Sequence, residues 1–193
     1  MGAYFFGKNF LDSACKIKIN TLPLHQQSNK RRDMEVQKIK VPVKQGLSII
    51  SEMIKLSYLC SYLGKSSGWI YNKMNHADTT TTSTGFNEKD LSEINTALGE
   101  IGSDLLRKRI LPITNPDIDT RTRKENIINQ LKEVSLIVAM PYIYVNKLGK
   151  TDNWYSKRTA KGTKYKFSND DLLTINMTIV EIASKLLSLE LTL

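Results

Sequence analysis

The stretch LGKSSGWIYNKMN, Leu63 to Asn75, decides which fold this chain can adopt. Its Gly64-Lys65-Ser66 matches the end of a phosphate-binding loop, which also needs a glycine five residues earlier so that successive backbone N–H groups surround the phosphates. That earlier position is Leu59, within an apolar run, and Gly149-Lys150-Thr151 fails the same test at Tyr144. The sequence therefore excludes a phosphate-binding loop, and Gly64 needs another explanation.

The motif around Gly64 occurs twice. Leu63-Gly64-Lys65 followed by Trp69 recurs as Leu148-Gly149-Lys150 followed by Trp154. A second block after the tryptophan also recurs, without a gap. In its first copy this block consists of Phe86, Asp90, Leu91, Ile94, Asn95, Glu100, Ile101, Ser103, Leu105 and Leu106, and in its second of Phe167, Asp171, Leu172, Ile175, Asn176, Glu181, Ile182, Ser184, Leu186 and Leu187. Identities at this density predict two tandem copies of one unit.

Each unit has the apolar spacing of amphipathic helices. Apolar residues recur at three- and four-residue steps before each glycine and again after each phenylalanine, as in Leu91, Ile94, Leu98, Ile101, Leu105 and in Leu172, Ile175, Ile179, Ile182, Leu186. Asn87 and Ser168 are suited to N-caps, with Asp90 and Asp171 three residues on in the capping-box position. Period-two alternation is limited to Lys164–Phe167, where a short hairpin arm is expected. The predicted fold class is all-α.

A glycine between two helices is typical of a helix-turn-helix motif. Gly64 and Gly149 are expected to adopt the left-handed conformation that ends the first helix, and Ser66 and Thr151 to cap the second. The predicted organisation is an N-terminal extension that is flexible or loosely packed (1–40), a first helical repeat (41–111), a linker (112–123) and a second repeat (124–193). Pro112 and Asn115-Pro116 interrupt any helix at the boundary.

The residues of this motif resemble two known families. LGKSSGWIYNKMN resembles the turn and recognition helix of Cro- and Xre-type repressors, with Cys60 as the small residue of the first helix and Ile70 as the branched core residue of the second, although Lys65 stands where those repressors usually have an apolar residue. The run Tyr…LGKSS-x-W-x-Y-x-K followed by F…L…IN…L…I is similar to a family of small uncharacterised proteins of Bacteroides-type bacteria and their mobile elements. That family usually carries one copy and implies no activity.

Charge and composition favour a binding protein over an enzyme. The chain has 28 Lys and Arg against 19 Asp and Glu, a net charge of +9, which favours polyanions such as nucleic acid. Neither a carboxylate pair nor a Ser-His-Asp or Cys-His arrangement is visible, so no catalytic, metal, cofactor or small-molecule site is expected. Two unpaired cysteines fit a reducing cytoplasm, and no apolar run has the length of a membrane span.

The predicted partner is double-stranded DNA, bound by the second helix of each motif. The exposed residues expected to contact bases or phosphates are Ser67, Tyr71, Asn72, Lys73 and Asn75 in the first copy, and Asn153, Ser156, Lys157, Arg158, Lys161, Lys164 and Lys166 in the second. The second copy is the stronger candidate because seven basic residues and one acid lie between Lys147 and Lys166. We expect a small transcriptional regulator of a bacterium or mobile element. The alternative is a helical adaptor that binds protein, with no DNA binding.

Overall fold

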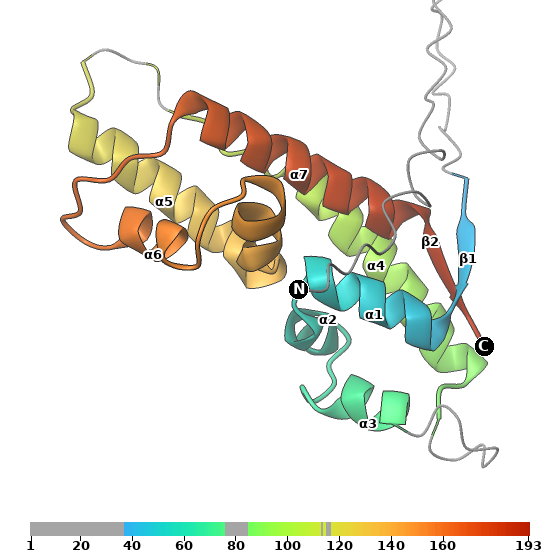
Figure 1. The fold of residues 1–193 in the computed structure, drawn as a ribbon. Coiled ribbons are helices and arrows are strands. Elements are labelled where there is room, and N and C mark those ends of the chain that lie inside the picture. Colours follow the sequence, from blue (N-terminus) through green and yellow to red (C-terminus); the bar gives the residue numbers. More distant parts are fainter. Residues whose placement is uncertain (1–36, 76–84, 113, 115–116) are drawn as a thin grey trace, which may run out of the picture. The chain divides into compact units, whose positions relative to one another are not determined.

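The computed structural model describes residues 37–75, 85–112, 114 and 117–193. The expected N-terminal extension therefore lies outside the described residues up to position 36. In chain order the elements are β1 (Ile39–Pro42), α1 (Val43–Met53), α2 (Leu56–Tyr62), α3 (Trp69–Asn75), α4 (Glu88–Arg107), α5 (Thr120–Ile137), the π-helix η2 (Tyr142–Lys147), α6 (Asn153–Thr159), α7 (Asn169–Ser188) and β2 (Leu189–Thr192) (Figure 1). The described part of the chain is mostly helical, as expected, with a small sheet that the sequence analysis did not predict.

The turns and helix starts follow local sequence. Gly64 and Gly149 have φ of 66° and 61°, which confirms that both residues take the left-handed conformation that glycine adopts at least cost. The capping boxes are also confirmed, because Asn87 accepts a hydrogen bond from the Asp90 N–H and Ser168 accepts one from the Asp171 N–H. These caps satisfy backbone donors at the starts of α4 and α7 that have no partner within the helix.

Two local expectations were wrong. Thr151 does not cap α6, which begins at Asn153 with Asp152 as its N-cap and without a side-chain cap bond. The backbone carbonyl of Thr151 accepts from the Trp154 N–H at 2.8 Å instead, and the Ser66 carbonyl accepts from the Trp69 N–H at 3.0 Å. A tight backbone turn thus replaces hydroxyl capping. Residues 164–167, expected to form a hairpin arm, lie in a loop.

The sheet joins the two ends of the described chain. β1 pairs in parallel with β2, with Ile39 opposite Leu189 and Val41 opposite Leu191. The two strands are far apart in the sequence, and such a pair has no hairpin turn that a sequence pattern could indicate. The pairing was therefore not predictable from local sequence. β2 follows α7 directly, and the contact with β1 therefore brings the residues before α1 to the end of α7.

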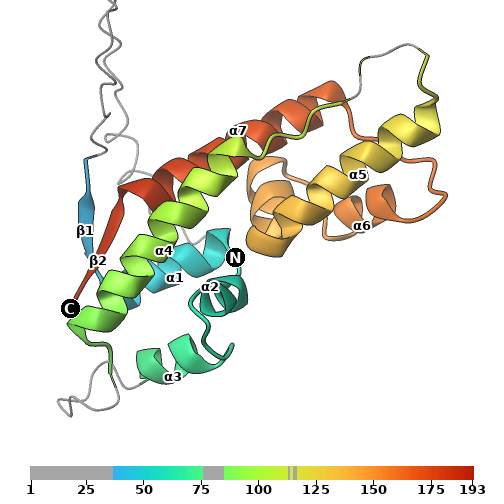
Figure 2. The same ribbon diagram turned by 180° about the vertical axis from the view of Figure 1, so that it is seen from behind.

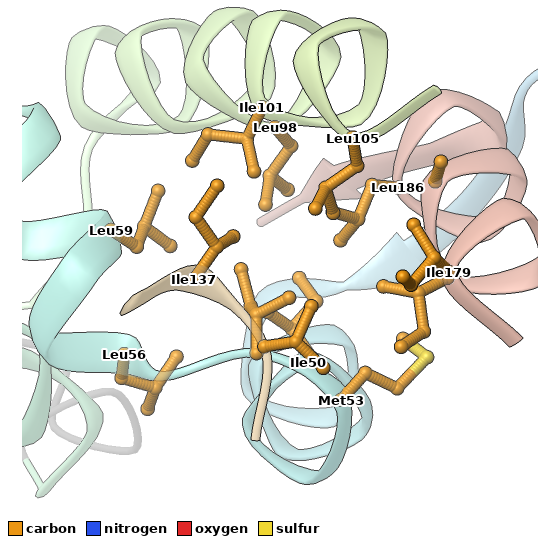
Figure 3. Packing of buried hydrophobic residues seen from close by; sticks show 14 of the residues in the cluster. Ile50, Met53, Leu56, Leu59, Leu98, Ile101, Leu105, Ile137, Ile179 and Leu186 are labelled. Atoms are coloured by element: carbon orange, nitrogen blue, oxygen red, sulfur yellow. The ribbon is translucent and has the colours of Figure 1, made fainter. Parts of the chain in front are cut away.

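The core is shared between the two expected repeats. α4 and α7 lie side by side in both views (Figures 1 and 2), and residues 36–193 form one compact unit. Figure 3 shows Leu98, Ile101 and Leu105 of α4 in one cluster with Ile137 of α5 and with Ile179 and Leu186 of α7. Because these side chains cover one another, neither repeat has a separate hydrophobic core.

Asn95 and Asn176 connect the two halves, which are named here the N-terminal half (residues 37–111) and the C-terminal half (residues 117–193). The Asn95 amide of α4 accepts from the Leu191 N–H at 2.8 Å and donates to the Leu191 carbonyl at 3.0 Å. The Asn176 amide of α7 makes the same two bonds with Ile110, at 2.8 and 3.0 Å. These side chains therefore hold a backbone segment of the opposite half against α4 and against α7.

Replacing Asn176 with alanine should lower the free energy of unfolding by about 2 kcal/mol, because the buried backbone N–H and C=O of Ile110 lose their partners. Urea unfolding followed by circular dichroism measures the change. Asn129→Ala on the exposed face of α5 is the matched control and should change stability by less than about 0.5 kcal/mol. Equal effects of the two substitutions would contradict the structural role of Asn176.

Candidate nucleic-acid interface

The strongest basic surface consists of α6 and the loop that follows it, residues 160–167, named here the basic loop. Trp154 of α6 is buried and meets the Phe167 ring edge-on, with 5.4 Å between ring centroids. The Arg158 guanidinium lies over the Trp154 ring at 4.4 Å, and its Nε donates to the Lys166 carbonyl at 2.8 Å. These contacts fix the end of the basic loop against α6.

A second contact fixes the middle of the basic loop. Lys124 of α5 donates from its ammonium group to the Thr163 carbonyl. Gly162, immediately before, has a φ of 71°, so the turn needs a residue without a side chain at that position. The loop therefore has defined anchors at Thr163 and Lys166, although it contains no strand.

The anchored loop and α6 leave polar and basic side chains on the surface. Arg158 is only partly exposed, because its guanidinium stacks on Trp154 and bonds the backbone. The other residues predicted for this copy are all exposed: Asn153, Ser156, Lys157, Lys161, Lys164 and Lys166. Four ammonium groups on one short segment can contact successive phosphates, the sequence-independent part of DNA binding, while Asn153 and Ser156 can bond base edges.

The corresponding surface of the N-terminal half has a different electrostatic character. Lys73 of α3, predicted to contact phosphate, has a side chain only 17% exposed and forms an ion pair with Asp90 at 2.8 Å. Its ammonium also donates to the Gly85 carbonyl and lies over the rings of Trp69 and Phe86. The ammonium group of Lys73 is therefore engaged in contacts within the protein, and these contacts attach α3 to the start of α4.

The remaining residues predicted for the first copy lie on the surface but do not form a basic face. Ser67, Tyr71, Asn72 and Asn75 are exposed. Ser67 and Tyr71 line a hollow of about 400 Å³ together with Lys55 and Ala139, next to the contact between the two halves. Lys55 donates to the Ser135 carbonyl across that contact. This face of α3 has hydroxyl and amide groups but few available charges.

The π-helix η2 distinguishes the C-terminal half from the N-terminal half. In α2 the Leu63 N–H donates to the Leu59 carbonyl, whereas in η2 the Leu148 N–H donates to the Ile143 carbonyl, one residue further back. The segment from Val138 to Gly149 contains one more residue than the segment from Ile54 to Gly64, and the wider turn of η2 accommodates it. The turn at Gly149 and then α6 follow directly from η2.

A pair of stacked tyrosines packs α6 against η2. Tyr144 of η2 and Tyr155 of α6 stack with 5.9 Å between centroids and 10° between ring planes. Burial raises the pKa of both phenols, and a hydrogen bond with Ser135 partly offsets this rise for Tyr155. Both phenols therefore stay protonated at neutral pH and contribute packing rather than charge.

Two features of this surface were not identified from the sequence. Lys124 was assigned only to the start of the second repeat, yet it anchors the basic loop from α5. The extra residue between Val138 and Gly149 was not identified either, although the apolar spacing before Leu148 carried a signal for it. The helix before Gly149 follows its counterpart with a shift of 84 residues (Ile54 to Val138), and the glycines themselves are 85 residues apart.

An apolar patch lies elsewhere on the C-terminal half. Leu173, Met177 and Val180 of α7 occupy successive turns and are exposed, with Met177 at 65%. Leu111, which follows the Ile110 bound by Asn176, is also exposed. The equivalent residues of α4 are Ser92, Thr96 and Gly99, which are small. Exposed apolar side chains on successive turns of one helix are typical of protein contacts.

Comparison with known proteins identifies one domain. Residues 43–110 match the family model described as Domain of unknown function (DUF5053). This segment begins with α1 and ends at Ile110, the residue bound by Asn176, so it covers most of the N-terminal half. No curated protein and no solved structure matches the chain. Among the described residues, no helix combines the length and apolar character that crossing a bilayer requires.

Proposed function

We propose that this protein is a non-enzymatic DNA-binding protein that binds double-stranded DNA mainly through α6 and the basic loop. The observation that carries the proposal is the exposure of Lys157, Lys161, Lys164 and Lys166 on a segment anchored by Lys124 and Arg158. An anchored cluster of cations loses little conformational entropy on binding phosphates. A solvated charged surface without anchors would lack this property.

The proposal includes two tandem helix-turn-helix units. It is supported by the matching φ of Gly64 and Gly149, by the two capping boxes, and by the edge-on Trp69–Phe86 and Trp154–Phe167 contacts. Two such units in one chain can imitate the dimer with which repressors bind two half-sites. Because α3 has few available charges and α6 has many, the bound site is expected to be asymmetric, with α6 at the stronger half-site.

A role as a small transcriptional regulator in the cytoplasm of a bacterium follows as part of the same proposal. The Cro- and Xre-like motif supports regulation, and the resemblance to small proteins of Bacteroides-type bacteria supports an origin in such a bacterium or its mobile elements. A domain without assigned activity at residues 43–110 is compatible with this role.

Fluorescence anisotropy of labelled mixed-sequence duplex DNA, titrated with the protein at several salt concentrations, tests the proposal. Affinity is expected to fall steeply with salt, with a slope of log affinity against log salt of about −3 to −4 if four phosphates are contacted. Absence of binding at about 50 mM salt, where phosphate contacts are strong, would refute DNA binding.

The second candidate function is a helical protein-interaction module without DNA binding. The exposed apolar side chains of Leu173, Met177 and Val180 on α7 favour it, because the equivalent residues of α4 in the N-terminal half are polar or small. Substituting Met177 with glutamate distinguishes the two functions. Under the DNA-binding proposal this substitution leaves duplex affinity unchanged, and under the alternative it abolishes capture of the protein partner.

A further inference from the structure

The contacts between the two halves are reciprocal. Asn95 of the N-terminal half binds the backbone of Leu191, and Asn176 of the C-terminal half binds the backbone of Ile110. Asn95 and Asn176 occupy matching positions in the two units, 81 residues apart, and the same shift relates Ile110 to Leu191. Each half therefore gives the other the same asparagine contact that it receives.

A second reciprocal contact joins the ends of α1 and α5. Ile54 and Val138 form an antiparallel bridge, flanked by the Lys55 N–H donating to the Ile137 carbonyl at 2.8 Å and the Ala139 N–H donating to the Met53 carbonyl at 2.9 Å. The same 84-residue shift relates Met53 to Ile137, Ile54 to Val138 and Lys55 to Ala139. Here equivalent backbone segments face each other directly.

A close approach between α4 and α7 has the same property. A Cβ atom added to Gly102 would lie 3.0 Å from the Ala183 carbonyl oxygen, and Gly102 and Ala183 are also equivalent positions, 81 residues apart. Contacts between equivalent residues, together with the reciprocal pair of Asn contacts, are the isologous pattern of a two-fold dimer. The bridge and the Asn contacts are directed at backbone atoms, so they depend little on which side chains the partner carries.

We propose that this interface is a self-sufficient dimerisation surface whose partner is another copy of the same domain, so that an N-terminal half can pair with the C-terminal half of a second chain. The match to residues 43–110 agrees with this, because a protein with one such unit would need a partner to cover Leu98, Ile101 and Leu105. The proposal concerns assembly and does not depend on DNA binding.

The connection between the halves offers a direct test, because its geometry is known at both ends. Leu111 exchanges two hydrogen bonds with the side chain of Gln130, at 2.8 and 2.9 Å. Asp119 is the N-cap of α5, and Gln130 follows it by 11 residues. The Cα atoms of Asp119 and Gln130 are therefore roughly 16 Å apart along the helix axis. The intervening residues 112–118 bridge this distance in the intact chain.

Deleting residues 112–118 joins Leu111 directly to Asp119, whose Cα atoms are then about 3.8 Å apart. The N-terminal and C-terminal halves of one chain can then no longer pair with each other. The N-terminal half of one chain can still pair with the C-terminal half of a second chain, which is a domain swap. The deletion variant is expected to have twice the monomer mass by light scattering, with the helical circular dichroism of the intact protein. The control, in which residues 112–118 become seven Gly and Ser residues, is expected to stay monomeric.

Two further measurements complete the test, and the first of them also decides the outcome if the deletion variant fails to fold. A protease site placed within 112–118 of the full chain allows cleavage after folding, and the two fragments should then elute together. Fragments that separate would overturn the proposal. In the deletion dimer, Asn95→Ala with Asn176→Ala should raise the dissociation constant at least roughly tenfold, and an unchanged constant would also contradict it. Because these readouts measure folding and association between the halves, they are independent of whether the protein binds DNA.

Discussion

Replacing Lys157, Lys161, Lys164 and Lys166 with alanine is expected to lower affinity for mixed-sequence duplex DNA by on the order of 100-fold at low salt. All four side chains are exposed on α6 and the basic loop, so their removal should leave the fold intact. Each lost phosphate contact reduces the salt slope by about one, and the slope should therefore fall by about 3 to 4. Anisotropy titrations at several salt concentrations measure both quantities.

A control variant with the same change in net charge separates a binding site from general attraction. Lys38, Lys40, Lys89 and Arg107 are exposed on the N-terminal half, and their replacement with alanine also removes four positive charges. If the basic loop is the site, this variant should retain affinity within about fivefold, because exposed charges beyond a Debye length contribute little. Equal losses for both variants would show that the net charge of +9, and no particular surface, attracts DNA.

Replacing Lys124 and Arg158 is a different experiment from replacing the exposed lysines, because these two side chains bond the backbone of the loop. Their exclusion from the variant above keeps the anchors in place. A loss of affinity in the exposed-lysine variant then reports the contribution of the cations themselves rather than a change in loop conformation.

Local features of this fold were predictable because their causes lie within a few residues. A turn that requires positive φ restricts the residue at Gly64 and Gly149 to one type, and a capping box places Asn87 and Asp90 three residues apart. The apolar stripes of α4 and α7 follow from helical periodicity. Such signals identify helices, turns and the face of each helix that becomes buried.

The remaining features depend on residues that are distant in the sequence. Lys73 and Lys157 both follow a tryptophan in a short helix. The Lys73 ammonium group forms an ion pair with Asp90 and lies over two aromatic rings, whereas Lys157 stays exposed. β1 forms because β2 lies beside it at the other end of the described chain. Sequence patterns therefore identified α6 as a candidate surface, but they could not show which cations tertiary contacts would occupy.

Replacing Gly102 with leucine should destabilise the fold more than any other single change considered, by about 3 kcal/mol. The first side-chain atom already meets the Ala183 carbonyl oxygen at 3.0 Å and the Leu186 Cβ at 3.3 Å. Backbone atoms of α7 cannot move aside as the end of a flexible side chain can, so α4 and α7 must separate. Overpacking of this kind costs about 1–3 kcal/mol or more.

Gly99→Leu in the same helix is the matched control, because a Cβ atom at Gly99 has no neighbouring atom within 4 Å. Leucine is a better helix former than glycine by up to about 1 kcal/mol, so this substitution should leave stability unchanged or raise it slightly. Urea unfolding of both variants measures the difference. Helix propensity favours leucine at both sites. Changes of opposite sign in the free energy of unfolding would therefore identify the close approach of α4 and α7 as the cause of the difference. Equal stability of the two variants would show that the helices can separate at no cost, which would contradict the close interface between the halves.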